Sequence, residues 1–358
     1  MTDVVARDEP LLSLRDVSVA FPVRSVVLNR TIGRVEAVAG VSFDINRGEV
    51  LGLVGESGSG KSTIARTIVG LHRATSGLIR FAGQDLSSVS AQEMRDLRRN
   101  IQMIFQDPYT SLNPRRTVWD IVKEAWEVHP DVVPRARWRA EFEDLIKRVG
   151  LSPDHGDRYP HQFSGGQRQR ISIARALALR PQLIICDEPV SALDVSIQAQ
   201  IVNLLQDLQE ELGLTYLFIA HDLSVVRHIS NRVAVMYLGK IVEVADKQEL
   251  FEQPTHPYTQ ALISAVPRPD AWRIGTRNRI VLTGDIPSPA WPPSGCRFRT
   301  RCWKAQTKCT AEEPSLETRA GLHPSACHFA STESGILPPK PIGGLFGEDG
   351  ARIGTRED

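Results

Sequence analysis

The most informative segment of the chain is Gly55-Glu56-Ser57-Gly58-Ser59-Gly60-Lys61-Ser62-Thr63. It follows a short apolar run, Val50 to Val54, and it opens a pattern typical of a helix, Lys61 to His72. In a loop placed between a strand and a helix, glycines let backbone N–H groups wrap phosphates, and the helix start adds about half a positive charge. The context therefore favours a phosphate-binding loop of an α/β protein over a plain glycine turn.

The side chains in this loop suit a nucleotide triphosphate. The charge of Lys61 would neutralise β- and γ-phosphate oxygens, and the hydroxyl of Ser62 would ligate Mg²⁺, because a hard cation prefers oxygen ligands. The candidate nucleotide-binding residues are Gly55, Glu56, Ser57, Gly58, Ser59, Gly60, Lys61, Ser62 and Thr63.

Two carboxylates end a second apolar run. Leu183 to Cys186 precedes Asp187 and Glu188, the arrangement in which the first acid reaches the Mg²⁺ shell and the second polarises the attacking water. Solvated acids at a strand end are the ordinary alternative, and the upstream loop decides against it. A further apolar run, Tyr216 to Ala220, follows the helical pattern Ser196 to Leu212, which indicates a parallel sheet with crossover helices.

Composition limits the class of protein. The chain has 358 residues, 41% of them apolar and 24% charged, as in ordinary folded proteins of more than one domain. A formal net charge of +1 offers no global field for nucleic acid. No apolar run approaches the roughly 18–20 residues of a spanning helix, and Met1 to Pro10 does not resemble a secretory signal, so we expect a cytoplasmic protein that reaches the membrane through partners.

Four further segments identify a family by their order and spacing. Phe163-Ser164-Gly165-Gly166-Gln167 resembles the signature of ABC cassettes, with Phe in place of the usual Leu. Gln106, after the run Ile101 to Phe105, resembles the Q-loop, Ser191-Ala192-Leu193-Asp194 the D-loop, and His221 the switch histidine. Each of these is weak alone, because a single Gln or His is usually a surface or structural residue.

The resemblance implies a fold and a site. The fold is an α/β P-loop NTPase cassette, with a RecA-like parallel core, an antiparallel β subdomain and an inserted helical subdomain. ATP would be hydrolysed in a head-to-tail pair of cassettes, with Glu188 as general base, Lys61 on the phosphates, Gln106 and His221 sensing the γ-phosphate, and Ser62, Gln106 and Asp187 around Mg²⁺. Ser164 and Gly166 would complete the partner's site, and Gly165, Gln167 and Asp194 are the remaining candidate nucleotide-binding residues.

One aromatic is a candidate for stacking on adenine. Phe21 precedes a basic, turn-prone insert from Pro22 to Arg34, which separates two strand-like runs, Leu11 to Val19 and Val35 to Ile45. A Phe that belongs to the core is the open alternative.

The resemblance narrows within the family. Asp107-Pro108-Tyr109-Thr110-Ser111-Leu112-Asn113-Pro114-Arg115 resembles a segment typical of oligopeptide and dipeptide importer ATPases. Pro254 to Thr259, Gly284 to Pro289 and Gly295 to Phe298 are similar to the C-terminal extension of the same proteins. We expect a flexible N-terminus at 1–10, the ATPase domain at 11–250 with its helical subdomain at about 107–180, the extension as a separate appendage at 251–330, and a flexible tail at 331–358.

Cysteines gather in the extension. Cys296, Cys302, Cys309 and Cys327 are four of the five in the chain, and in a reducing compartment such a set favours metal over disulfides. In the resembling family the set is associated with a [4Fe–4S] cluster, whose charge nearby Arg and Lys side chains would offset. Zinc and unmetallated thiols stay open as alternatives. Cys186, within an apolar run, is expected to be a buried small hydrophobe.

The family also implies partners: a second, related ATPase subunit, two membrane permease subunits, an extracytoplasmic substrate-binding protein, and a place on the cytoplasmic face of the membrane without nucleic acid. Nickel, glutathione or another small solute is an alternative cargo to peptides. A non-transport ABC ATPase acting on RNA or DNA is disfavoured, because the chain has one phosphate loop and no sustained heptads. Glu188 and His221 argue against a regulator that binds nucleotide without hydrolysis.

Overall fold

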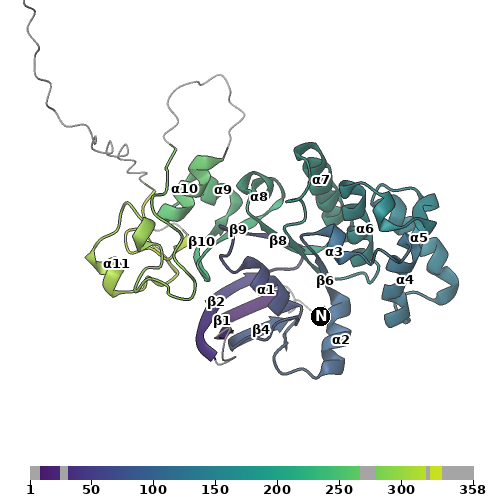
Figure 1. Ribbon diagram of the computed structural model, residues 1–358, viewed down its shortest axis with the longest axis horizontal. Coiled ribbons are helices and arrows are strands. Elements are labelled where there is room, and N and C mark those ends of the chain that lie inside the picture. The colour runs from purple at the N-terminus through teal and green to yellow at the C-terminus, as the bar shows by residue number, and fades with distance from the viewer. Residues whose placement is uncertain (1–8, 25–30, 267–278, 320–322, 333–358) are drawn as a thin grey trace, which may run out of the picture.

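A computed structural model describes residues 9–24, 31–266, 279–319 and 323–332 (Figure 1). Predictions for most of the N-terminal segment and for the tail from residue 333 lie outside these ranges. The strands are β1 (Leu12–Arg24), β2 (Thr31–Ile45), β3 (Val50–Val54), β4 (Ser76–Phe81), β5 (Gln84–Asp85), β6 (Ile101–Ile104), β7 (Leu183–Asp187), β8 (Thr215–Ala220), β9 (Arg232–Tyr237), β10 (Lys240–Asp246), β11 (Glu317–Thr318) and β12 (Pro324–Ser325).

The α-helices are α1 (Lys61–Ile68), α2 (Ala91–Asn100), α3 (Pro108–Ser111), α4 (Val118–Val128), α5 (Trp138–Arg148), α6 (Gly165–Leu177), α7 (Val195–Leu212), α8 (Leu223–Ile229), α9 (Lys247–Glu252), α10 (Pro257–Ala265) and α11 (Thr307–Ala311). Short 3₁₀ helices are η1 (Arg135–Arg137), η2 (Pro153–Asp157), η3 (Pro160–Gln162) and η4 (Arg299–Arg301). No helix within the described ranges combines the length and the apolarity needed to cross a membrane.

The core is a mixed sheet with the strand order β11-β12-β10-β9-β3-β8-β7-β6, parallel from β9 to β6. Alternate residues of β3, β7 and β8 enter two different apolar clusters, one for each face of the sheet. Burial on both faces explains the uninterrupted apolar runs seen in the sequence. Because these strands are parallel, the residues that follow them meet at one sheet edge, and this confirms the predicted α/β class.

A second, antiparallel sheet has the order β2-β1-β4-β5 and packs with α1 on one of those two clusters. It confirms the predicted antiparallel subdomain. The strands are longer than the sequence indicated: Phe21 pairs with Val35 and Pro22 with Arg34, so both ends of the predicted turn-prone insert are strand.

A helical layer from α3 to α6 lies at one end of the molecule (Figure 1). Its core holds Trp126, whose indole Nε1–H donates to the carbonyl of Ala178 at 2.9 Å, and Phe142, both fully buried. Pro130 follows the C-cap of α4 and cannot continue this helix, because proline has no backbone N–H and disfavours helical geometry in the residue before it.

Residues 279–319 and 323–332 lie at the opposite end (Figure 1). Together with residues 251–266 they form what we call the C-terminal region, which is tied to the core sheet. Ser325 of β12 pairs with Glu243 of β10. The Glu243 carboxylate is fully buried and accepts hydrogen bonds from the Thr255 backbone N–H (2.7 Å) and hydroxyl (2.8 Å), and the ring Nε2 of His323 lies 2.6 Å from it. The C-terminal region therefore completes the edge of the core sheet, a connection that the change in composition near Phe251 did not predict.

Candidate nucleotide-binding site

The phosphate loop lines a cavity of about 430 Å³ at the carboxyl edge of the parallel strands. At two positions of the phosphate loop only glycine fits, because backbone carbonyl oxygens of other segments approach closely. A Cβ on Gly60, whose φ is +106°, would lie 2.3 Å from the carbonyl oxygen of Ala37, and one on Gly55 would lie 2.1 Å from that of Met236. The lining residues are Ala37, Ser57, Gly58, Ser59, Gly60, Lys61, Ser62, Thr63, Gln106, Glu188 and His221.

Lys61 is buried with its amino group inside the loop. It donates to the carbonyls of Gly55 at 2.7 Å and Glu56 at 2.9 Å. Burial lowers the pKa of Lys61, and the nearby carboxylates of Glu188 and Asp187 act against that lowering. The arrangement holds a cation where phosphate oxygens would enter the loop.

Ser62 and Asp187 meet across the sheet edge: the Ser62 hydroxyl donates to Asp187 Oδ1 at 2.8 Å. Burial raises the pKa of Asp187, while the hydrogen bond from Ser62 lowers it. A hydroxyl and a carboxylate oxygen side by side, next to a phosphate loop, fit the oxygen donors that Mg²⁺ prefers. These two residues would hold the ion.

Three strand ends converge on one carboxylate. Glu188 Oε2 accepts a hydrogen bond from Gln106 Nε2 at 2.9 Å and lies 3.3 Å from His221 Nδ1. Glu188 itself has a φ of +48°, a left-handed conformation that is uncommon outside glycine and is often found at functional sites. The structure thus brings together the three residues that the sequence could associate only by order.

The signature segment lies apart from this cavity. Ser164 caps α6, accepting from the Gln167 N–H at 3.3 Å, and Gln167 in return accepts from the Ser164 N–H at 3.0 Å. A Cβ on Gly166 would lie 2.6 Å from Ile197 of α7, so the signature packs on the helix that Asp194 begins. Within a single chain the two halves of the predicted site do not meet.

Phe21 does not line the cavity. Its ring packs edge-to-face on His72, with 5.2 Å between ring centroids. A role for Phe21 in stacking on adenine stays a prediction. Its register is set by the strand pairing of β1 with β2, which the insert concealed. Ala37, which no sequence signal singled out, lines the cavity instead.

All five cysteines carry free thiols, and Cys186 is fully buried as expected. In the C-terminal region, burial raises the pKa of Cys302 to about 12 and of Cys327 to about 11, and neighbouring cysteines add to both shifts. Among the described residues, however, no group of three or more His, Cys, Asp or Glu side chains is placed to hold a metal ion. The predicted [4Fe–4S] cluster on Cys296, Cys302, Cys309 and Cys327 is thus not supported.

Comparison with known proteins gives two family matches. Residues 38–191 match the ABC transporter family, and residues 242–309 match the oligopeptide/dipeptide transporter C-terminal region. The chain is 56% identical to the oligopeptide transport ATP-binding protein AppF of Bacillus subtilis, over 91% of this chain and 99% of that protein. It is 51% identical to the oligopeptide transport ATP-binding protein OppF of Salmonella typhimurium, over 88% and 96% of the two chains.

Solved structures agree with the fold. The dimeric, post-hydrolysis ATP-binding cassette MJ0796 with ADP and phosphate is 28% identical, covering 66% of this chain and 98% of that one, with a TM-score of 0.59. CbiO1 of Clostridium perfringens, part of an ABC transporter complex, is 28% identical, covering 68% and 91%, with a TM-score of 0.58. With these matches the chain belongs to the ABC transporter ATP-binding proteins, in the oligopeptide/dipeptide importer family.

Proposed function

We propose that this chain is the ATP-hydrolysing subunit that energises import of di- and oligopeptides across the cytoplasmic membrane. The ATPase activity is supported mainly by the position of Glu188, which Gln106 contacts and which lines the same cavity as the phosphate loop. The peptide cargo is supported by the names of the relatives and by the match of residues 242–309, and these favour peptides over nickel or glutathione.

The reaction converts ATP and water to ADP and phosphate. Lys61 neutralises phosphate oxygens, and Ser62 and Asp187 would hold the Mg²⁺ that offsets further charge. Glu188 accepts a proton as the water oxygen bonds to the γ-phosphorus and the bond to the ADP oxygen breaks. The bond from Gln106 and the proximity of His221 fix Glu188 Oε2, so the base is positioned before substrate arrives.

A second cassette would complete the site. Ser164, Gly165, Gly166 and Gln167 stand at the start of α6, away from the cavity of their own chain. The capping box uses the N–H groups of Ser164 and Gln167, and those of Gly165 and Gly166 are the ones placed to meet an anion. Beside them the apolar side chain of Val195 is 81% exposed, as a residue covered in an assembly would be. We infer a head-to-tail pair in which each signature faces the phosphate loop of the partner.

The membrane subunits would dock on an open groove between the helical layer and the core sheet. Its volume is about 430 Å³, and two exposed apolar side chains, Leu71 and Val128, line it with Phe105 and Met103. Because the groove lies beside Gln106, which also lines the nucleotide cavity, a permease segment bound in the groove would be coupled to the nucleotide site. Closure of the cassettes on ATP would then move the permeases. An extracytoplasmic binding protein would deliver the peptide to them, and the chain itself would lie at the cytoplasmic face.

The test is uptake of labelled di- and oligopeptides by cells that lack this chain and other peptide importers. Wild type should restore uptake, and Glu188→Gln should not, because loss of the base slows turnover by about 10²–10⁴. Glu210→Gln, an exposed glutamate of α7, is the matched control and should restore uptake fully. If cells without the chain take up peptides normally, the peptide assignment fails. If Glu188→Gln restores uptake, the assignment of the base fails.

A further inference from the structure

The phosphate loop is held from outside its own motifs. Glu56, the second residue of the loop, forms a two-pronged ion pair with Arg301, Nη1 to Oε2 at 2.7 Å and Nη2 to Oε1 at 3.1 Å. The backbone N–H of Glu56 donates to the hydroxyl of Tyr258 at 2.8 Å. Both partners belong to the C-terminal region, 202 and 245 residues along the chain from Glu56.

This ion pair differs from an ordinary surface pair. The side chain of Arg301 is only 8% exposed and that of Glu56 24%. A planar guanidinium that grips a carboxylate with two parallel bonds fixes orientation as well as distance. Arg301 is itself packed, with its guanidinium 5.9 Å from the ring of Tyr237, which in turn contacts Tyr258 at 4.8 Å between centroids.

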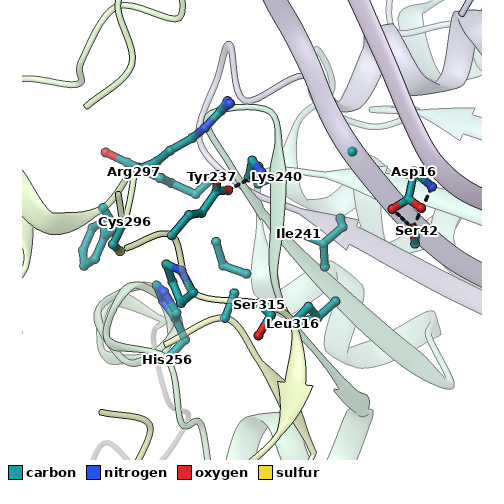
Figure 2. A pocket seen from close by; sticks show the side chains of 16 residues that line it. Asp16, Ser42, Tyr237, Lys240, Ile241, His256, Cys296, Arg297, Ser315 and Leu316 are labelled. Carbon is teal, nitrogen blue, oxygen red and sulfur yellow. Dashed lines mark hydrogen bonds and ion pairs between the residues drawn. The ribbon is translucent and has the colours of Figure 1, made fainter. Parts of the chain in front are cut away.

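A second arginine from the same segment is linked to the loop indirectly, through the turn between β9 and β10. Arg297 donates to the carbonyl of Leu238 at 2.6 Å and pairs with Glu36 at 3.2 Å. Gly239, which follows Leu238, donates its N–H to the carbonyl of Ser59 in the phosphate loop at 2.8 Å. Figure 2 shows Arg297 with Cys296 beside Tyr237 and Lys240, in a cavity of about 520 Å³ between the C-terminal region and the β9–β10 hairpin.

We propose that Arg301 is a positioning residue of the phosphate loop, and that the affinity of the cassette for MgATP depends on the C-terminal region through the Arg301–Glu56 pair. The ion pair is connected to the phosphate site through one hydrogen bond, because Lys61 Nζ donates to the carbonyl oxygen of Glu56. A displaced Glu56 would therefore change the direction of the ammonium group that meets the phosphates. The inference rests on the proposed nucleotide site.

The experiment measures MgATP binding to the full-length chain by titration with a fluorescent ATP analogue, together with kcat and KM for ATP hydrolysis by the assembled transporter. Arg301→Gln should raise the Kd and KM about tenfold, in the usual range of coupling between sites, with kcat reduced less. Arg301→Lys keeps the positive charge but loses the two parallel hydrogen bonds of the guanidinium, and its Kd should lie between those of wild type and Arg301→Gln. Arg299→Gln is the matched control from the same 3₁₀ helix, because its guanidinium donates to Ser294 within the C-terminal region, and its Kd should equal that of wild type.

A double-mutant cycle separates positioning from general loss of structure. If the pair acts as a unit, Glu56→Gln and Arg301→Gln together should weaken binding no more than the worse single change. Glu56→Gln also tests the pair from the loop side if Arg301→Gln does not fold. An unchanged Kd in these variants, or losses that add in the double variant, would overturn the inference. A wild-type chain that binds no MgATP would instead overturn the proposed nucleotide site.

Discussion

Replacing Glu243 by glutamine tests how firmly the C-terminal region is built into the fold. The carboxylate is fully buried and ionised: burial acts to raise the pKa of Glu243, but the hydrogen bonds from His323 and from the Thr255 backbone outweigh it and hold the pKa below its usual range. Its second oxygen accepts the backbone N–H of His256 at 3.1 Å. Glutamine has the same shape, yet it removes the charge and turns one acceptor into a donor that faces other donors.

Breaking a buried, paired charge in this way costs about 3–5 kcal/mol of unfolding free energy. In a chain of this size we expect the melting temperature to fall by about 6–10 °C, measured by differential scanning fluorimetry. Glu252→Gln, on the exposed end of α9, is the control and should change stability by less than about 0.5 kcal/mol. A shift below about 2 °C for Glu243→Gln, with the control unchanged, would refute the view that this carboxylate anchors the C-terminal region to the core sheet.

Three further outcomes follow from single contacts. Burial lowers the pKa of His256 to about 4, so as the pH falls the histidine of the unfolded chain takes up a proton before that of the folded chain. The stability contribution of the neutral ring is therefore present above about pH 6.5, and the free energy of unfolding should fall by about 2 kcal/mol by pH 5. Urea titrations should show a weaker pH dependence for His256→Asn. Gly166→Ala drives a methyl group to within 2.6 Å of Ile197, and should cut ATP turnover in the assembled transporter at least about tenfold while MgATP binding by the isolated chain stays the same. Ser62→Ala removes the hydroxyl beside Asp187 and should raise the Mg²⁺ concentration for half-maximal hydrolysis about tenfold, whereas unchanged Mg²⁺ dependence would exclude this residue from the ion's shell.

The parallel core was predictable because its signals are local. β3, β7 and β8 are buried on both faces, which leaves apolar runs that end where polar site residues begin. Each chemical group then follows its strand directly, as Glu188 follows β7 and His221 follows β8. Short-range pattern and loop chemistry were therefore sufficient to place the phosphate loop, the carboxylates and the histidine at one sheet edge.

The edge of the sheet was not predictable in the same way. β10 carries Glu243 at a fully buried position. In the sequence a glutamate is the mark of a solvent-exposed position, so the apolar pattern of this strand was interrupted and the strand was not predicted. The groups that satisfy this carboxylate come from residues 255, 256 and 323, far from it in sequence. The adenine-stacking role of Phe21 stays a prediction for a related reason, because the position of Phe21 depends on the register of β1 against β2.

These two features, the buried carboxylate and the arginine that holds Glu56, lead to one view of the C-terminal region. A segment that only decorated the cassette would contact its surface through exposed, exchangeable pairs. Here one of its contacts completes a hydrogen-bonding shell inside the core sheet, and another reaches the second residue of the phosphate loop through a largely buried ion pair. Because a buried charge left without its partner is costly, these contacts tie the C-terminal region to the cassette, as the proposed role of Arg301 at the phosphate loop requires.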